Sequence, residues 1–223
     1  MDQLIQSFFN LEILSQASPI LLSGFWMTVK LTLVVVPLGL AGGLVVALAS
    51  TSRSRLVRWL TVIYVDFFRA FPPLVLLMFI AFGLPFLGFD PGAFVAVALS
   101  FLLNTSSYYG EIFRAGIESI TRGQHEAARS TGLSGPQTMA YVVLPQAVKN
   151  VVPDLVSNTL EVIKLTSLAS VVALPELLFA ARQAQSLTYN ATPIIAAGII
   201  YLVCLWPLVR LLSRFEHRQI ALH

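Results

Sequence analysis

Polar side chains recur at helical spacing inside an apolar stretch in the second half of the sequence. They occupy positions i, i+3, i+4 and i+7, with one more residue a turn later: Asp154, Ser157, Asn158, Glu161 and Lys164. Residues at this spacing share one face of an α-helix. Because a central charge costs a membrane-spanning helix about 2.5–3.5 kcal/mol, such residues usually face a protein interior or a water-filled cavity. The pattern therefore favours a polar substrate pathway or a contact between subunits.

Two of these side chains could instead neutralise each other. Glu161 and Lys164 are neighbours at i, i+3, so an ion pair within one helix is the structural alternative. Asp66 and Arg69 have the same spacing in an earlier apolar segment, and there we expect a structural pair. The step at 72–73 contains two prolines, which remove two backbone donors and should kink that helix.

The residue types that perform covalent catalysis or bind metals do not occur at the spacings that a catalytic or metal site requires. His125, His217 and His223 have no adjacent nucleophile and no ligand spacing. Cys204 is the only cysteine, which excludes an internal disulfide, and we expect it to be a small core residue. No G-x-x-x-x-G-K-[ST] loop is present to hold a nucleotide phosphate. We expect no catalytic residue, cofactor or metal in this chain.

The composition places these residues in a membrane protein. Of 223 residues, 57% are hydrophobic and 11% are charged, whereas soluble domains average about 45–50% and about 25%. A helix needs roughly 20 apolar residues to cross a bilayer. Charge-free windows of this length run over 31–52, 70–89, 91–110 and 183–209. The net charge of +3 could suggest a nucleic-acid partner, but the placement of the charges argues against one.

A fifth span is expected over 148–178, which contains the polar face and is weak by hydropathy alone. Basic residues of short loops stay on the cytoplasmic side. With five spans and the N-terminus outside, Arg182 is the only basic loop or tail residue on the outer side. Segment 13–29 either adds an interfacial helix or extends the first span. Ten basic residues then lie inside: Arg53, Arg55, Arg58, Arg114, Arg122, Arg129, Lys149, Arg210, Arg214 and Arg218. We expect an all-α integral membrane protein of about five transmembrane helices, a single domain over 1–223 with its C-terminus inside.

The longest polar insertion, 114–149, is predicted to form a cytoplasmic helical hairpin. Its first helix would carry 124–130, and Gly132 stands where a helix end needs a left-handed residue. Ser134 and Gln137 make an S-x-x-Q capping box for the second helix. Spacing alone leaves a generic helix-turn-helix connection as the alternative.

Within this hairpin the residues resemble the EAA loop of ABC importer permeases. That pattern consists of EAA, then a glycine four residues after the second alanine, then a hydrophobic residue followed by LP. The matching residues are Glu126, Ala127, Ala128, Gly132, Leu144 and Pro145. The resemblance implies that these residues, with Gln124, couple the chain to an ATPase subunit.

Further segments resemble the polar amino acid branch of that family, which includes histidine, glutamine, arginine and opine permeases. They read GQHEAARSTGLS, VLPQAVKNVVPDL and KLTSLASVVALPELL, and the similarity covers about 20–218. The resemblance implies a multi-pass permease in the bacterial inner membrane. It also implies two ATPase subunits that bind ATP and Mg, a second permease subunit, identical or homologous, a solute-binding protein outside, and an amino acid substrate.

Two departures from the branch concern the substrate. Ala70, Phe71 and Pro73 replace the usual G, T and L, and the pair at 157–158 stands where the branch commonly has N-E. From the residues alone, a stand-alone secondary transporter or channel is the alternative, with the charges at 154, 161 and 164 as an ion relay. Such carriers often show repeated halves with broken helices, and we see no convincing repeat.

Overall fold

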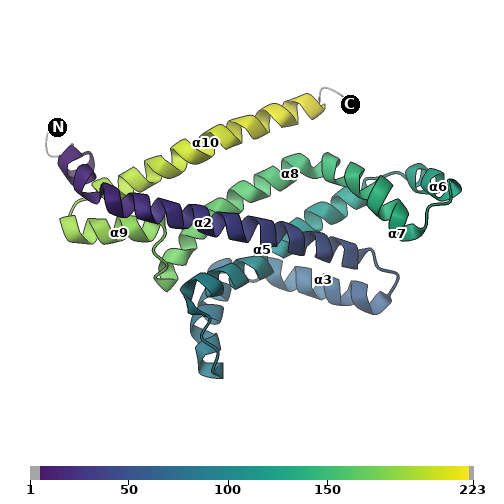
Figure 1. The fold of residues 1–223 in the computed structure, drawn as a ribbon, viewed down its shortest axis with the longest axis horizontal. Coiled ribbons are helices and arrows are strands. Elements are labelled where there is room, and N and C mark those ends of the chain that lie inside the picture. The colour runs from purple at the N-terminus through teal and green to yellow at the C-terminus, as the bar shows by residue number, and fades with distance from the viewer. Residues whose placement is uncertain (1–5, 221–223) are drawn as a thin grey trace. The chain divides into compact units, whose positions relative to one another are not determined.

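The computed structural model describes the backbone of residues 6–220 and the side chains of residues 6–210. Within that part every regular element is a helix, which confirms the expected all-α fold (Figure 1). The predictions for Arg214, His217, Arg218 and His223 concern side chains outside the described part. The elements in chain order are α2 (Leu11–Ser50), α3 (Arg55–Ala70), α4 (Pro73–Met78), a π-helix (Phe79–Gly83), a 3-10 helix (Leu84–Leu87), α5 (Gly92–Glu118), α6 (Arg122–Ser130), α7 (Gly135–Thr138), a π-helix (Met139–Val143), α8 (Leu144–Leu165), a 3-10 helix (Thr166–Val172), α9 (Leu177–Thr188) and α10 (Thr192–Ile220).

Three helical runs of the described part are long and apolar enough to cross a membrane. They are Gln6–Ser50, Gly135–Val172 and Thr192–Arg210, and a fourth is obtained if α3 and the helices up to Leu87 count as one broken span. The second run contains most of 148–178, the span that hydropathy alone left weak. The remaining expected span, 91–110, falls in α5, which has the length but is not apolar enough to qualify by composition.

Polar residues lower the hydropathy of α5, and two of them are buried and bonded to the neighbouring helix α3. Asn104 and Ser106 are 3% and 2% exposed. The Asn104 amide donates to the Phe68 carbonyl oxygen at 3.0 Å, and the Tyr64 hydroxyl lies 2.7 Å from Ser106 Oγ. Polar side chains between helices can bind helices together inside a bilayer. This half of α5 is therefore built for contact with protein rather than lipid.

The double proline breaks the chain between α3 and α4, as expected. Phe71 is extended, with φ −80° and ψ 126°, because a residue that precedes proline avoids the helical region. The new helix then begins at Pro73, whose missing N–H would lack a partner at that position anyway.

The structure settles one boundary that the sequence left open and moves another. Segment 13–29 extends the first span, since α2 is one helix of 40 residues, about 60 Å long at 1.5 Å per residue. The expected span 183–209 is wrong at its start, because residues 183–188 end α9. There Tyr189 takes a left-handed conformation with φ 50°. Asn190 Oδ1 then accepts the Thr192 N–H at 2.9 Å, an Asx turn that leads into α10.

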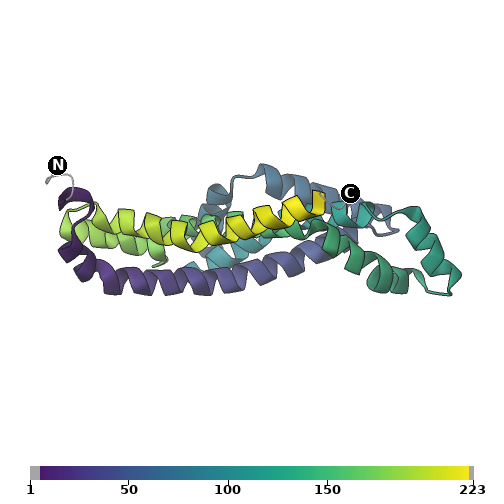
Figure 2. The same ribbon diagram turned by 90° about the horizontal axis from the view of Figure 1, so that it is seen from above.

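Contacts divide the chain into two compact units. The first comprises Met1–Val36, Pro73–Phe101 and Leu160–His223. In it the N-terminal part of α2 packs with α9 and α10, which Figure 2 shows side by side. Their contact is built from small and aliphatic residues: Ala17, Leu21, Leu177, Ala181, Ala184 and Ala197.

The second unit comprises Pro37–Pro72 and Leu102–Thr159. In it the C-terminal part of α2 approaches α5 closely through glycines. A Cβ atom at Gly43 would overlap Tyr109 Cβ, and one at Gly39 would overlap Thr105 Oγ1. Small residues let helix backbones approach in membranes, where packing drives association.

Candidate functional site

The turn of the hairpin between α6 and α7 is set by Gly132. Its φ is +88°, a left-handed conformation that glycine adopts without strain. The Gly132 N–H donates to the Arg129 carbonyl oxygen at 3.0 Å and the Leu133 N–H to that of Ala128 at 3.3 Å. These two bonds form a Schellman motif, the helix end predicted from the sequence.

The second arm starts at the predicted capping box. The Ser134 N–H donates to Gln137 Oε1 at 2.8 Å, and Pro136 lies in the first turn. The helix then passes through a π turn, in which the Leu144 N–H donates five residues back to Met139. The wider turn precedes Pro145, whose ring would clash with a carbonyl in a regular helix. The LP pair therefore marks the point where the hairpin arm continues into α8.

The hairpin exposes most of the residues that resemble the EAA loop. Ala128 is buried and Leu144 is partly buried. Gln146 Nε2 donates across the arms to Gln124 Oε1, at 3.3 Å. The exposed members are Gln124, Glu126, Ala127, Gly132 and Pro145. All seven predicted residues therefore lie on α6, on the turn after it and at the start of α8, and Figure 1 shows this hairpin at the labels α6 and α7.

The base of the hairpin is tied to α5 and α8. A Cβ at Gly116 would lie 2.8 Å from the Ala147 carbonyl oxygen, so the two helices touch there through backbone. The Asn150 amide donates to Ser119 Oγ at 3.0 Å nearby. A force applied to the hairpin therefore acts directly on two long helices.

An ion network that the sequence analysis missed lies at the end of α5, beyond the expected span 91–110. Arg114 binds Glu111 through two hydrogen bonds of 2.9 Å and contacts Glu118 at 2.6 Å. The hydrogen bonds from Arg114 hold the pKa of Glu111 below its usual value, although burial opposes this shift. The i, i+3 spacing of Glu111 and Arg114 was the available signal.

The expected Asp66–Arg69 pair is wrong. Arg69 Nη1 lies 3.7 Å from Glu111 Oε2 instead, and its guanidinium lies over the Tyr108 ring at 5.4 Å. Asp66 makes no ion pair with any described residue. Arg69 reaches a carboxylate on another helix, a tertiary contact that spacing along one helix cannot reveal.

The polar face of α8 is largely open in this chain. Asp154, Ser157, Glu161 and Lys164 are exposed, and Asn158 is partly buried. Lys164 Nζ lies 2.5 Å from Glu161 Oε1, which confirms the ion pair weighed as an alternative. Their side chains remain 50% and 67% exposed, so pairing has not removed them from contact with other molecules.

Glu176 is a buried acid to which the sequence analysis gave no role. Its carboxylate accepts the N–H groups of Leu178 and Phe179 at 2.9 and 2.8 Å, and the Tyr201 hydroxyl at 3.1 Å. It therefore caps α9 and joins that helix to α10. Thr28 Oγ1 on α2 accepts the neighbouring Leu177 N–H at 3.1 Å. The available signal was an acid directly before an apolar helix.

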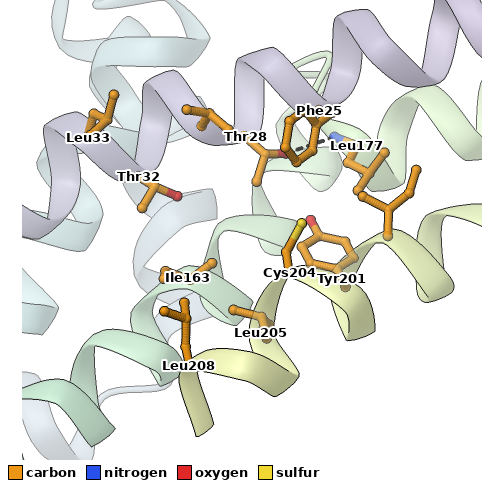
Figure 3. A pocket seen from close by; sticks show the side chains of 12 residues that line it. Phe25, Thr28, Thr32, Leu33, Ile163, Leu177, Tyr201, Cys204, Leu205 and Leu208 are labelled. Carbon is orange, nitrogen blue, oxygen red and sulfur yellow. Dashed lines mark hydrogen bonds between the residues drawn. The ribbon is translucent and has the colours of Figure 1, made fainter. Parts of the chain in front are cut away.

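A pocket of about 190 Å³ lies beside this cap. Figure 3 shows Tyr201 directed toward the segment that carries Thr28 and Leu177, with Phe25 and Cys204 close by. Apolar side chains dominate the lining, so the pocket offers little to a charged ligand. Cys204 is exposed on α10 rather than in the core, which corrects that expectation.

Comparisons with known proteins agree with this geometry. The family described as "Binding-protein-dependent transport system inner membrane component" matches residues 39–220. The probable amino-acid ABC transporter permease protein YckA of Bacillus subtilis (strain 168) is 35% identical over 198 residues, covering 88% of this chain and 88% of the relative. The arginine transport system permease protein ArtQ of the same organism is 37% identical over 187 residues, covering 83% and 85%.

A solved structure gives the same result. The crystal structure of an amino acid ABC transporter with histidines has a TM-score of 0.83 and 36% identity, and the match covers 92% of this chain and 96% of that chain. The resemblance inferred from the hairpin is therefore confirmed. The chain belongs to the inner membrane components of binding-protein-dependent transport systems and is a permease subunit of an ABC importer.

Proposed function

We propose that this permease carries a polar amino acid or a close relative. The named relatives transport amino acids, and the face of α8 offers a carboxylate, an ammonium and amide or hydroxyl groups to a zwitterion. In this proposal Asp154, Ser157, Asn158, Glu161 and Lys164 line the pathway. A second permease subunit, identical or homologous, covers the face from the other side.

The energy comes from a partner ATPase, which binds ATP and Mg. It docks on the exposed hairpin residues, and its closure moves α5 and α8 through the contacts at the hairpin base. A solute-binding protein delivers the substrate from outside. The N-terminus lies outside and the C-terminus inside, as the basic residues require.

The exposed Glu161–Lys164 pair carries the proposal for the pathway. Both charged side chains lie in a helical run that is apolar enough to span the membrane. Even so, the Glu161 side chain is 67% exposed in this chain and the Lys164 side chain is 50% exposed. Because exposed charges in lipid are costly, a partner subunit, water or substrate must cover them.

A competition assay tests this role. Reconstituted complexes with Glu161→Gln should assemble normally but take up cationic substrates about tenfold less well, since a hydrogen bond to a charged group is lost. Uptake of a labelled amino acid is measured against arginine, histidine and glutamine. Glu12→Gln removes an exposed carboxylate from α2 and is the matched control.

A purely structural pair gives a different result. Glu161→Gln would then destabilise the complex, Lys164→Met would largely rescue it, and the order of substrate preference would stay unchanged. That outcome would remove Glu161 from the pathway.

A further inference from the structure

A pocket of about 560 Å³ with several charged lining residues lies along α3, and none of its lining residues belongs to α6, α7 or α8. All of its lining residues belong to the second unit. They include three arginines, two acids and a tryptophan: Arg55, Arg58, Arg114, Asp66, Glu111 and Trp59. Neither the coupling role nor the substrate pathway uses this pocket.

The positive charge at one end of the pocket is not neutralised by the protein. Arg114 is already bound to Glu111 and Glu118. Arg55 and Arg58 form no ion pair with any residue that the structure describes. Asp66 cannot serve both, because it stands 11 residues beyond Arg55, about 16 Å along the helix axis. The two arginines therefore leave a local site for an anion.

The backbone reinforces this charge. Arg55 is the first residue of α3, a helix of 16 residues. The Ser54 hydroxyl accepts only the Val57 N–H, at 3.5 Å, so the first-turn N–H groups are weakly capped. Helix N-termini favour phosphate groups because these N–H groups and the helix dipole attract anions. Arg58 Nη1 donates to the Ser52 carbonyl oxygen at 2.6 Å, which keeps its guanidinium over this end.

The surroundings favour a lipid over a free anion. Trp59 lines the pocket and is 65% exposed, and Leu56 and Leu60 beside it on α3 are 66% and 55% exposed. Tryptophan concentrates where a membrane meets water. Basic clusters directly cytoplasmic to a span attract anionic headgroups. An acyl chain could lie on the apolar surface while the phosphate reaches the arginines.

We propose that this pocket binds an anionic phospholipid, whose phosphate lies between Arg55 and Arg58 at the start of α3. The lipid would steady the turn between α2 and α3 at the cytoplasmic surface.

Lipid retention tests the proposal. The complete importer complex is placed in nanodiscs of phosphatidylethanolamine and phosphatidylglycerol, and the lipids kept after release are counted by native mass spectrometry. Wild type should retain phosphatidylglycerol preferentially. Arg55→Gln should weaken that retention about fivefold, the effect of one basic residue near an anionic surface. Arg55→Lys should keep most of it.

Arg53→Gln is the matched control, because Arg53 is exposed in the same turn but does not line the pocket. It should leave retention unchanged. Equal retention by wild type and Arg55→Gln would overturn the proposal, as would an equal loss in Arg53→Gln, which would indicate diffuse surface charge. Displacement of the lipid by excess inorganic phosphate would instead assign a free-anion site. Membrane abundance and ATPase pull-down show that each variant is assembled.

Discussion

Glu176 combines two tasks in one buried carboxylate. It accepts two N–H groups at the start of α9 and the hydroxyl of Tyr201 on α10. An N-cap contributes about 1 kcal/mol, and a buried partner left without a hydrogen bond costs about 1–3 kcal/mol. The residue therefore stabilises the joint between the last two helices.

Glu176→Ala should consequently lower the stability of the complex by about 2–4 kcal/mol. The thermal unfolding midpoint of the purified complex measures this loss. Glu12→Ala, which removes an exposed acid, should change the midpoint little. Equal midpoints for the two variants would show that the cap contributes nothing.

The lowered pKa of Glu111 predicts how the stability of the fold changes with pH. Its pKa is lowered in the folded protein, chiefly by hydrogen bonds from Arg114. A carboxyl with a depressed folded pKa stabilises the fold above its unfolded pKa of about 4.3, and this contribution disappears as the pH falls through the folded pKa. Wild type should therefore exceed Glu111→Gln in thermal stability at pH 7, and the difference should shrink progressively below about pH 4.3. A difference that stays constant down to acid pH would refute the assignment.

Local signals made the hairpin the most predictable element. Its signals are the glycine at the turn, the capping box and the LP pair. Each of them depends only on residues a few positions away, so it can be recognised in the sequence. The start of α10 was missed for the opposite reason. Tyr189 adopts a left-handed conformation without being glycine, and only its surroundings impose that state.

Gly132→Asp should leave the chain inserted but uncouple it. A side chain at φ +88° strains the turn by about 1–2 kcal/mol, and the new charge would face the ATPase. ATP-dependent uptake should fall while membrane abundance stays normal, and ATPase pull-down should weaken. Gly132→Asn tolerates the left-handed state and adds no charge, so it should retain more activity. Wild-type uptake by a normally expressed Gly132→Asp variant would contradict docking at this turn.

The contact between α2 and α5 depends on the absence of one carbon atom. Gly43→Ala places a Cβ that overlaps Tyr109 Cβ, so the helices must separate. Such overpacking costs about 1–3 kcal/mol. Gly198→Ala is the matched control, since no atom beyond its chain neighbours and its own helix backbone lies within 4 Å of that Cβ position. Membrane abundance and thermal stability should fall for the first variant alone, and equal behaviour would argue against close helix packing.

At the scale of the whole molecule, the sequence predicted the helical class, the family and most of the spans. It could do so because apolar length and charge asymmetry are properties of the chain itself. The partner of Arg69 and the role of Glu176 were missed, since both depend on residues from distant helices. The single-domain organisation and the orientation remain predictions.

Cysteine labelling measures the orientation. In a background with Cys204→Ser, cysteines at Ser52 and Gly123 should react only after the inner face is opened. A cysteine at Gly88 should react from outside, because basic residues favour the cytoplasmic side for the other loops. Labelling in the reverse order would refute the orientation. Labelling of Gly123 and Asn190 from one side would refute the span that contains α8.

Coupling to a partner ATPase is measured most directly by uptake of a labelled amino acid into proteoliposomes. The permease is reconstituted with its second permease subunit and binding protein, with or without the ATPase. Because this chain carries no phosphate-binding loop of its own, uptake should require both ATP and the ATPase, and an ion gradient should not replace them. Uptake driven by an ion gradient in the absence of the ATPase would contradict this function.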